Sequence, residues 1–304
     1  MNTPSLHLAI GVFDGVHLGH RAVIHSAREL ARQTNGKVGV LTFDPHPSRL
    51  LRPQAPTLLI FNRQQKDARL IEAGAQFIHH QNFDSAHAAI PAEEFPRWLK
   101  NEFPSLRSIH IGKNFHYGQG RQGQSQTLKR DAETLGLAVY VIDAVDCENT
   151  PISSSRIRQA LSEGNLTLAN QMLLRPYEAE GILIQGRQLG RTLGYPTINL
   201  DWNPELKPAY GVYAVECVTP EGTAEAGVAN WGLRPTVENH GVKPLLETHL
   251  LQPTGRIPVV GDSVRIRWLK RLREEIKFPD TLALKSQIAI DENRAREFHG
   301  LLVR

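Results

Sequence analysis

The first half of the chain alternates short apolar runs with longer segments of helical periodicity. An opening apolar run ends at Ile10. Further short, buried strands are predicted at 38–43, 76–79, 108–111 and 138–142. Helices are predicted around them, at 21–33, 62–73, 92–103 and 125–135. Regular alternation of this kind indicates a parallel sheet with helices on both faces, a doubly wound α/β domain.

The pattern changes near Arg175-Pro176, after which strand-like segments dominate. Strands are predicted at 179–185, 211–218, 224–230, 245–251 and 262–269. Pro220-Glu221-Gly222 is a turn signal between two of them. Several short strands separated by turns favour a small, closed antiparallel β-barrel. An amphipathic helix over 281–302 is expected to pack on it. The sequence therefore predicts two domains, 1–175 and 176–304.

Composition narrows the class of protein. The chain has 304 residues, of which 40% are hydrophobic and 22% are charged, as in an ordinary globular protein. Its net charge of +4 suits small anionic ligands, and no dense Lys/Arg block indicates nucleic-acid binding. Two cysteines cannot build a disulfide framework. We see no signal peptide and no run long enough to span a bilayer, so we expect a cytoplasmic protein without membrane attachment.

Residues 8–20 carry the strongest chemical signal: an apolar run, a glycine-rich turn, and then the start of a helix. Helix N-termini offer unpaired N–H groups and a positive dipole end, which suit a triphosphate. Gly11, Gly15 and Gly19 allow close approach of the backbone. His17 and His20 are predicted to project to the same side and to donate to phosphate oxygens. The alternative is a glycine-rich turn with two surface histidines.

Two other interpretations of this turn lose their support. The Gly-x-x-x-x-Gly-Lys-Ser/Thr pattern of a P-loop does not occur in the sequence. A zinc site would need further ligands, but Cys147 and Cys217 are far apart, and no carboxylate stands at helical spacing beside the two histidines.

A second segment, 151–158, opens another predicted helix with Ser153, Ser154 and Ser155, followed by Arg156 and Arg158. The hydroxyls alone would be explained as an N-cap cluster. Hydroxyls, helix N–H groups and a fixed guanidinium together form a phosphate clamp. His-x-Gly-His near the start and Ile-Ser-Ser-Ser-x-Ile-Arg here resemble the nucleotidylyltransferase superfamily, whose Rossmann-like domain grips ATP between two such motifs. The glycine-rich loop 112–118 also follows a predicted strand.

The predicted barrel has a motif of its own over 186–199, rich in glycine and containing Arg187 and Arg191. It is either a flexible loop or a phosphate-binding loop. The Thr197 hydroxyl and the Asn199 carbonyl are hard oxygen ligands that suit Mg²⁺. Glu247 stands in an apolar strand, where a partner such as Arg265 or Arg273 would stabilise it. It could also serve as a general base for a substrate hydroxyl.

Taken together, the motifs resemble one family from Ile10 to Glu297. The chain is similar to the bacterial bifunctional riboflavin kinase/FMN adenylyltransferases, also called FAD synthetases. The similarity rests on segments that occur in the family's order: 11–20, 42–47, 152–158, 186–199, 211–213, 228–236, 247–249 and 272–278.

The resemblance implies two reactions and two sets of site residues. The first domain would transfer AMP from ATP to FMN, giving FAD, and the barrel would phosphorylate riboflavin with ATP, giving FMN. For adenylyl transfer it implies catalytic His17 and His20 and ATP contacts from Gly11, Phe13, Asp14, Gly19, Asn114, Ser154, Ser155 and Arg158. For the kinase it implies the base Glu247, Mg²⁺ ligands Thr197 and Asn199, ATP contacts from Gly186, Gly190, Arg191, Gly194 and Thr197, and flavin contacts from Arg273 and Phe278.

Two rival functions stay open at this point. A single-activity adenylyltransferase with a binding barrel would lack Thr197, Asn199 or Glu247, and all three are present. A flavin sensor that controls gene expression would need a nucleic-acid-binding element, and neither a basic helix nor a helix-turn-helix insertion is evident. We expect small-molecule partners only, and a monomer or weak homo-oligomer.

Overall fold

The computed structural model describes residues 4–186, 189–234 and 243–301. The chain divides into two compact units, Met1–Arg156 and Ile157–Arg304. Each unit is described by itself. No helix in the described ranges is both long and apolar enough to cross a membrane.

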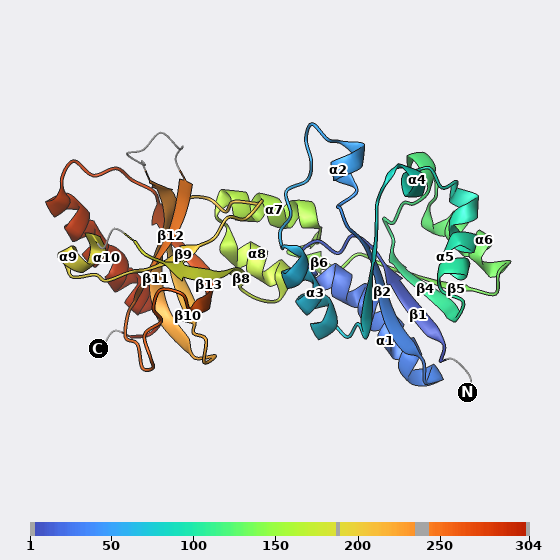
Figure 1. Ribbon diagram of the computed structural model, residues 1–304, viewed down its shortest axis with the longest axis horizontal. Coiled ribbons are helices and arrows are strands. Elements are labelled where there is room, and N and C mark those ends of the chain that lie inside the picture. The colour runs from blue at the N-terminus through green and yellow to red at the C-terminus, as the bar shows by residue number, and fades with distance from the viewer. Residues whose placement is uncertain (1–3, 187–188, 235–242, 302–304) are drawn as a thin grey trace. The chain divides into compact units, whose positions relative to one another are not determined.

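The first unit is built on a five-stranded parallel sheet (Figure 1). Its strands are β1 (Leu6–Ile10), β2 (Lys37–Phe43), β3 (Phe77–Gln81), β4 (Leu106–Gly112) and β5 (Ala138–Ile142). Their order, β3-β2-β1-β4-β5, reverses between β1 and β4. A small hairpin follows, formed by β6 (Asp146–Cys147) and β7 (Thr150–Pro151). The doubly wound sheet predicted from the sequence is confirmed, and ligands of such sheets bind where the strand order reverses.

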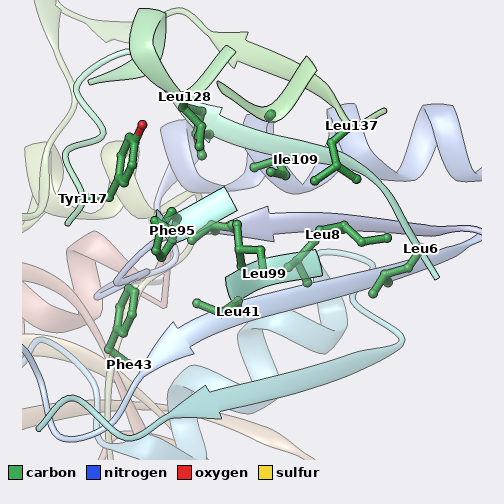
Figure 2. Close-up of a cluster of buried hydrophobic side chains, with 14 residues drawn as sticks. Leu6, Leu8, Leu41, Phe43, Phe95, Leu99, Ile109, Tyr117, Leu128 and Leu137 are labelled. Carbon is green, nitrogen blue, oxygen red and sulfur yellow. The ribbon is translucent and has the colours of Figure 1, made fainter. Parts of the chain in front are cut away.

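Helices cover both faces of this sheet. They are α1 (Leu18–Thr34), α2 (Ser48–Leu51), α3 (Arg63–Glu72), α4 (Ser85–Ala88), η1 (Ala92–Glu94), α5 (Phe95–Glu102), η2 (Gln119–Arg121) and α6 (Ser125–Glu133). Strand β1 alternates between two cores: Leu6, Leu8 and Ile10 pack with side chains of α5 and α6 (Figure 2). Ala9 packs on the other face with α1 and α3. Continuous burial of β1 follows from this double covering.

Five polar side chains form a continuous hydrogen-bonded network inside this unit. His7 contacts the Ser108 hydroxyl through Nδ1 at 2.7 Å and the Thr34 hydroxyl through Nε2 at 2.8 Å. Ser108 also contacts His110 Nε2 at 2.8 Å, and His110 Nδ1 contacts the Ser26 hydroxyl at 2.9 Å. The network thus joins β1, β4 and α1.

The donors and acceptors in this network can be assigned one after another, starting from Thr34. The Thr34 hydroxyl donates to the carbonyl oxygen of Leu30, so it accepts from His7 Nε2–H. Neutral His7 then accepts at Nδ1 from Ser108, and Ser108 accepts from His110 Nε2–H. Both rings are therefore satisfied in the neutral form. Burial lowers the pKa of His7, and burial together with nearby His7 lowers the pKa of His110 to about 4.

The second unit is a closed barrel with helices packed against it. Its strands are β8 (Tyr177–Ile184), β9 (Ile198–Asp201), β10 (Gly211–Val218), β11 (Ala224–Arg234), β12 (Lys243–Leu250) and β13 (Ser263–Glu274). The order is β10-β11-β12-β9-β8-β13, and β13 pairs with β10 to close the barrel. Every pair is antiparallel, as predicted. Trp231, Trp268, Tyr177 and Tyr213 are fully buried and dominate its core.

Helices α7 (Ser154–Glu163) and α8 (Leu166–Leu173) precede the barrel, and residues 157–173 pack on it. Asn170 of α8 donates to the carbonyl oxygen of Trp268 at 2.8 Å and accepts from the Tyr177 amide at 2.8 Å. The division at 175/176 predicted from the sequence places both helices in the first domain, and it stays a prediction about the functional domains.

The C-terminal helix α10 (Thr281–Phe298) packs on the barrel, but not as the amphipathic helix that was expected. Ala295 is its buried apolar anchor, whereas Leu282 and Phe298 are exposed. Its second anchor is polar: buried Asp291 pairs with Arg273 of β13 at 2.7 Å. The ion pair between α10 and β13 thus takes the place of part of the apolar face that was expected on α10. Short helix α9 (Leu189–Leu193) lies in the glycine-rich segment that precedes β9.

We expect acid to weaken the sheet of the first unit through His110. The unfolded ring takes up a proton below pH about 6.5, whereas the folded ring stays neutral down to a pKa of about 4. The free energy of unfolding is therefore at its full value above pH about 6.5. It falls as the pH drops from there toward 4, and the loss is about 2 kcal/mol at pH 5. Hydrogen exchange of β1 and β4 peptides, measured by mass spectrometry at pH 7 and pH 5 and corrected for the intrinsic rate, reports the loss.

The matched variants are His110→Gln and His25→Gln, the latter at an exposed position of α1. His110→Gln should flatten the pH dependence, and His25→Gln should leave it unchanged. An identical pH dependence in wild type and His110→Gln contradicts the assignment.

Candidate active sites

The turn between β1 and α1 has an unusually strained backbone. Phe13, Gly15 and Val16 all have positive φ angles, of 53°, 86° and 40°. Glycine adopts such angles freely, but a β-branched residue such as Val16 does so at a cost of roughly 1–3 kcal/mol. Strain of this size persists only where the surroundings over-determine the conformation.

Three hydrogen bonds from outside the turn hold it in place. The Thr42 hydroxyl donates to the carbonyl oxygen of Val12 at 2.9 Å. The Ser154 hydroxyl, at the start of α7, donates to the carbonyl oxygen of Asp14 at 2.8 Å. The Ile60 amide donates to the buried Asp14 carboxylate at 3.0 Å. Asp14 and Ser154, expected to touch phosphate, therefore have a clear second role as anchors of the turn.

The two histidines that follow the turn act as a pair. His17 is the N-cap of α1, and its Nδ1 accepts from the His20 amide at 3.4 Å. Their rings stack with centroids 3.6 Å apart, so they lie on the same side, as their spacing predicted. Because Nδ1 of His17 accepts, the proton of the neutral ring is on Nε2.

These residues open onto a cavity of about 490 Å³, which we name the helix-end cavity. Most of the expected phosphate ligands of the first domain line it: Gly11, Phe13, His17, Gly19, His20, Asn114, Ser154 and Ser155. Asp14 lies behind the turn and lines a smaller hollow of about 30 Å³. Arg158 lies one helical turn after Ser154 on α7, just beyond the end of the first unit. Lys113, paired with Asp143 at 3.1 Å, also lines the cavity and was not predicted.

A second cavity in the same unit, of about 680 Å³, was not predicted at all. We name it the aromatic cavity, since ring side chains dominate its wall: Phe43, Phe83, His87, Phe95, Phe115, His116 and Tyr117. Burial lowers the pKa of His87, which favours the neutral ring. The sequence signals were the segments 42–47 and 112–118, which line this cavity in part. A cavity of this size and polarity suits a flat organic ligand.

The barrel has a cavity of about 540 Å³, which we name the barrel cavity. Gly186, Arg191, Thr197 and Asn199, four of the residues expected to bind ATP and Mg²⁺ in the barrel, line it. Asn199 is 5% exposed, and its Oδ1 has no hydrogen-bond partner among the described residues. Thr248, which was not predicted, also lines the cavity with a buried, unpartnered hydroxyl. Unpartnered buried oxygens are costly unless a ligand completes them.

Other residues of the predicted kinase motif shape the loop instead of lining this cavity. A side chain at Gly190 would collide with the carbonyl oxygen of Tyr195, whose amide donates to the Gly190 carbonyl oxygen at 2.7 Å. Gly194 has a φ of 93°, which favours glycine. His249 of β12 donates from Nδ1 to the carbonyl oxygen of Pro196 at 2.8 Å, which fixes the residue before Thr197. Arg187 and residues 235–236 lie outside the described residues.

Glu247 lies on β12 directly between two asparagines. The register pairs it with Asn199 of β9 on one side and with Asn230 of β11 on the other. Directly opposed residues share one face of a sheet, so the carboxylate is beside the Asn199 amide.

Of the two arginines suggested as structural partners of Glu247, Arg273 is engaged elsewhere. Arg273 pairs with Asp291 and also donates to the carbonyl oxygen of Glu274 at 2.7 Å. Its guanidinium lies 5.8 Å from the centre of the Phe278 ring. Arg273 and Phe278, the predicted flavin contacts, do not line the barrel cavity, and their role stays a prediction.

The fold and its cavities define a class of protein. A doubly wound domain presents a helix N-terminus and two histidines to one cavity, and a barrel presents glycines, an arginine and hard oxygens to another. Such an arrangement is typical of a two-domain enzyme whose domains each offer a cavity to a phosphorylated ligand.

Comparison with known proteins identifies the family. The family described as FAD synthetase matches residues 1–156, and the family described as riboflavin kinase matches residues 173–299. The bifunctional riboflavin kinase/FMN adenylyltransferase of Escherichia coli K12 is 35% identical over 97% of this chain and 93% of its own length. That of Bacillus subtilis is 34% identical with the same coverage. The chain belongs to the bifunctional riboflavin kinase/FMN adenylyltransferase family.

One solved structure matches over nearly the whole chain. It is the crystal structure of a protein named as a macrolide-efflux protein from Streptococcus pneumoniae, with a TM-score of 0.86 and 29% identity, covering 97% of this chain and 95% of that one. That name applies to the Streptococcus protein alone, and the similarity confirms the two-part fold.

Two adjacent serines at the N-terminus of α7 test whether Ser154 holds the strained turn. Ser154→Ala should lower stability by about 1 kcal/mol, because it removes a hydrogen bond to the strained turn. Ser155→Ala should leave the melting temperature unchanged, because Ser155 is exposed at the same cavity. Calorimetric melts of the two variants make the comparison. Equal melting temperatures would show that the Ser154 bond does not hold the turn.

Proposed function

We propose that this chain makes FAD from riboflavin in two ATP-dependent steps, one in each domain. The first domain transfers AMP from ATP to FMN and releases pyrophosphate. The barrel transfers the γ-phosphoryl group of ATP to riboflavin. The observation that carries the proposal is that each unit has a cavity of its own with phosphate-binding donors, and that in the barrel the register places Glu247 opposite a lining residue, Asn199. We propose a functional division near Arg175.

Two adjoining cavities in the first domain match the two substrates of adenylyl transfer. The helix-end cavity suits the ATP phosphates, since α1 N–H groups and the two histidines face it. The aromatic cavity suits the isoalloxazine ring of FMN. Both cavities are lined by Val12, Asn114, Phe115 and Arg121. Bound in this way, the FMN phosphate would meet the α-phosphate of ATP at the shared wall.

The chemistry of this step explains why the site needs no general base. The FMN phosphate is already an anion near pH 7, so its oxygen can attack without losing a proton. The protein has to position two anions and neutralise the charge that develops between them. We assign this to His17, His20, Ser155 and Arg158 together with the N-terminus of α1.

The kinase step has a different requirement, because its nucleophile is a neutral ribityl hydroxyl. Glu247 is half-buried at the centre of β12 and is the carboxylate we assign as general base. Arg191 and Gly186 line the cavity where the ATP phosphates would bind. Thr197 precedes β9, and its loop is fixed by the hydrogen bond from His249 to Pro196.

Mg²⁺ fits the barrel cavity through the hard oxygens of Thr197 and Asn199. The observation that supports this fit is the Oδ1 of Asn199, which is buried and has no hydrogen-bond partner among the described residues. It is a carbonyl oxygen of the kind that coordinates Mg²⁺. When bound with ATP, Mg²⁺ neutralises phosphate charge. No group of three or more His, Cys, Asp or Glu side chains that could hold a metal by itself occurs in the described part of the chain. Most ligands of the ion would therefore come from ATP phosphates and water.

Incubating the purified chain with riboflavin, ATP and Mg²⁺, then separating the flavins by chromatography, tests the proposal directly. FMN should form first and FAD should follow. A chain that binds flavins but converts none would overturn the catalytic assignment.

Single substitutions should separate the two activities. His20→Ala should still make FMN from riboflavin, and FMN should accumulate, because the barrel is a separate compact unit. Glu247→Gln keeps the side-chain volume but removes the base, so FMN formation should fall by about 10²–10⁴-fold. The same variant should still convert supplied FMN to FAD. Melts near wild type must accompany both results. A folded His20→Ala protein that loses both reactions contradicts the two-site arrangement.

Substitution of a proposed Mg²⁺ ligand in the barrel should change the Mg²⁺ dependence of the kinase reaction alone. Asn199→Ala should raise the Mg²⁺ concentration needed for half-maximal kinase rate, because it removes a carbonyl ligand. The adenylyl-transfer rate at the same Mg²⁺ concentrations should be unchanged, which serves as the internal control. Elemental analysis of the EDTA-treated, nucleotide-free protein should find no stoichiometric metal. An unaltered Mg²⁺ titration of the kinase would exclude Asn199 as a ligand.

A further inference from the structure

The loop after β4 is closed at its base by backbone hydrogen bonds. Tyr117 and Gly123 exchange two backbone hydrogen bonds, with N–O distances of 3.1 and 2.9 Å, which close the loop at its base. Within it, Gly118 and Gly120 have φ angles of 71° and 62°. Arg121 also has a positive φ, of 60°, which is uncommon for a residue with a side chain. The loop thus holds Arg121 in a left-handed backbone conformation that arginine rarely adopts.

Contacts with the rest of the unit fix the position of the loop. The Gln119 amide donates to the carbonyl oxygen of Ile90 at 2.7 Å. A side chain at Gly118 would collide with the backbone of Ala92, and one at Gly123 would collide with the Tyr117 ring. The base of the Arg121 side chain is therefore preorganised without a ligand.

Arg121 occupies a distinctive place between the two cavities of the unit. It lines both the helix-end cavity and the aromatic cavity, together with Val12, Asn114 and Phe115. Among these four shared residues, Arg121 is the charged one. Lys113 in the helix-end cavity is paired with Asp143, whereas no carboxylate within the described ranges pairs with the Arg121 guanidinium. A cation held at the wall that the two cavities share is suited to bind a phosphate from each side.

We propose that Arg121 is a catalytic residue of adenylyl transfer, whose guanidinium bridges the FMN phosphate and the α-phosphate of ATP. This inference rests on the substrate placement proposed above. In the step, an oxygen of the FMN phosphate forms a bond to the α-phosphorus. The bond from that phosphorus to the oxygen bridging the α- and β-phosphates breaks, and its electron pair leaves with pyrophosphate. No proton is transferred.

The bridging role follows from the electrostatics of this reaction. Two phosphate anions must approach within bonding distance, and negative charge accumulates on the oxygens around the α-phosphorus. A guanidinium offers several N–H donors in one plane, so it can bind an oxygen of each phosphate at once. Lysine would supply the charge but not the fork. Donors already aimed at developing charge lower the barrier, because they need no reorganisation during the step.

The test compares Arg121→Gln and Arg121→Lys with Arg130→Gln. Arg130 is a matched control, because it is exposed on α6 and lines neither cavity. FAD formation from FMN and ATP is measured at saturating substrates, and FMN binding is measured by flavin fluorescence. We expect kcat to fall by about 10²–10³-fold in Arg121→Gln, by analogy with loss of a transition-state hydrogen-bond donor. Arg121→Lys should recover part of the rate, and Arg130→Gln should match wild type.

Four further measurements decide the outcome. The kinase rate of each Arg121 variant should stay within twofold of wild type, which confirms an intact barrel. A folded Arg121→Gln protein with normal kcat overturns the proposal. So does a raised KM for FMN at unchanged kcat, because that result would mean ground-state binding alone. If the wild-type chain itself makes no FAD from FMN, the proposed function fails instead, so the two failures are distinguishable.

Discussion

The strained turn between β1 and α1 is the constraint on which the first active site depends. Phe13 and Val16 hold positive φ angles that they would abandon in a free peptide. The strain is offset by hydrogen bonds from three separate parts of the chain: Thr42, Ile60 and Ser154. Since those donors lie at the end of β2, before α3 and at the start of α7, the turn forms only when the domain is assembled. The geometry of this helix end is therefore a property of the whole fold.

The two candidate sites differ as their chemistries require. In adenylyl transfer both partners are anionic phosphates, and the helix-end cavity presents cations and N–H donors: His17, His20, Lys113 and Arg121. In riboflavin phosphorylation the nucleophile is uncharged, and the barrel places Glu247 beside Asn199 through a register that pairs β12 with β9. The residues that would hold ATP are helix-end and histidine donors in one case and an arginine-bearing glycine loop in the other. The two candidate sites thus offer two unrelated arrangements for binding phosphate.

Much of this could be predicted from the sequence because it depends on local patterns. The apolar runs predicted the strands of the doubly wound sheet and five of the six barrel strands, all but β9. The spacing of His17 and His20 predicted that they face one way. The aromatic cavity was missed, because its walls come from segments between residues 12 and 121 that only the fold brings together. The partner of Arg273 was also missed, since Asp291 lies on a helix whose apolar pattern gave no hint of a polar anchor.

The buried histidine network gives a physical reason why the histidine turn and the Arg121 loop stay aligned at one end of the sheet. Strands β1 and β4 are neighbours at the point where strand order reverses, and their carboxyl ends lead into the histidine turn and the Arg121 loop. Their pairing shifts register after Leu6, so that Ser108 stands opposite His7. The hydrogen bond between these two side chains accompanies that shift. A one-residue slip would break the network and turn the side chains of a strand to the other face. The register that aligns the two loops at one end of the sheet is thus specified by polar contacts within it.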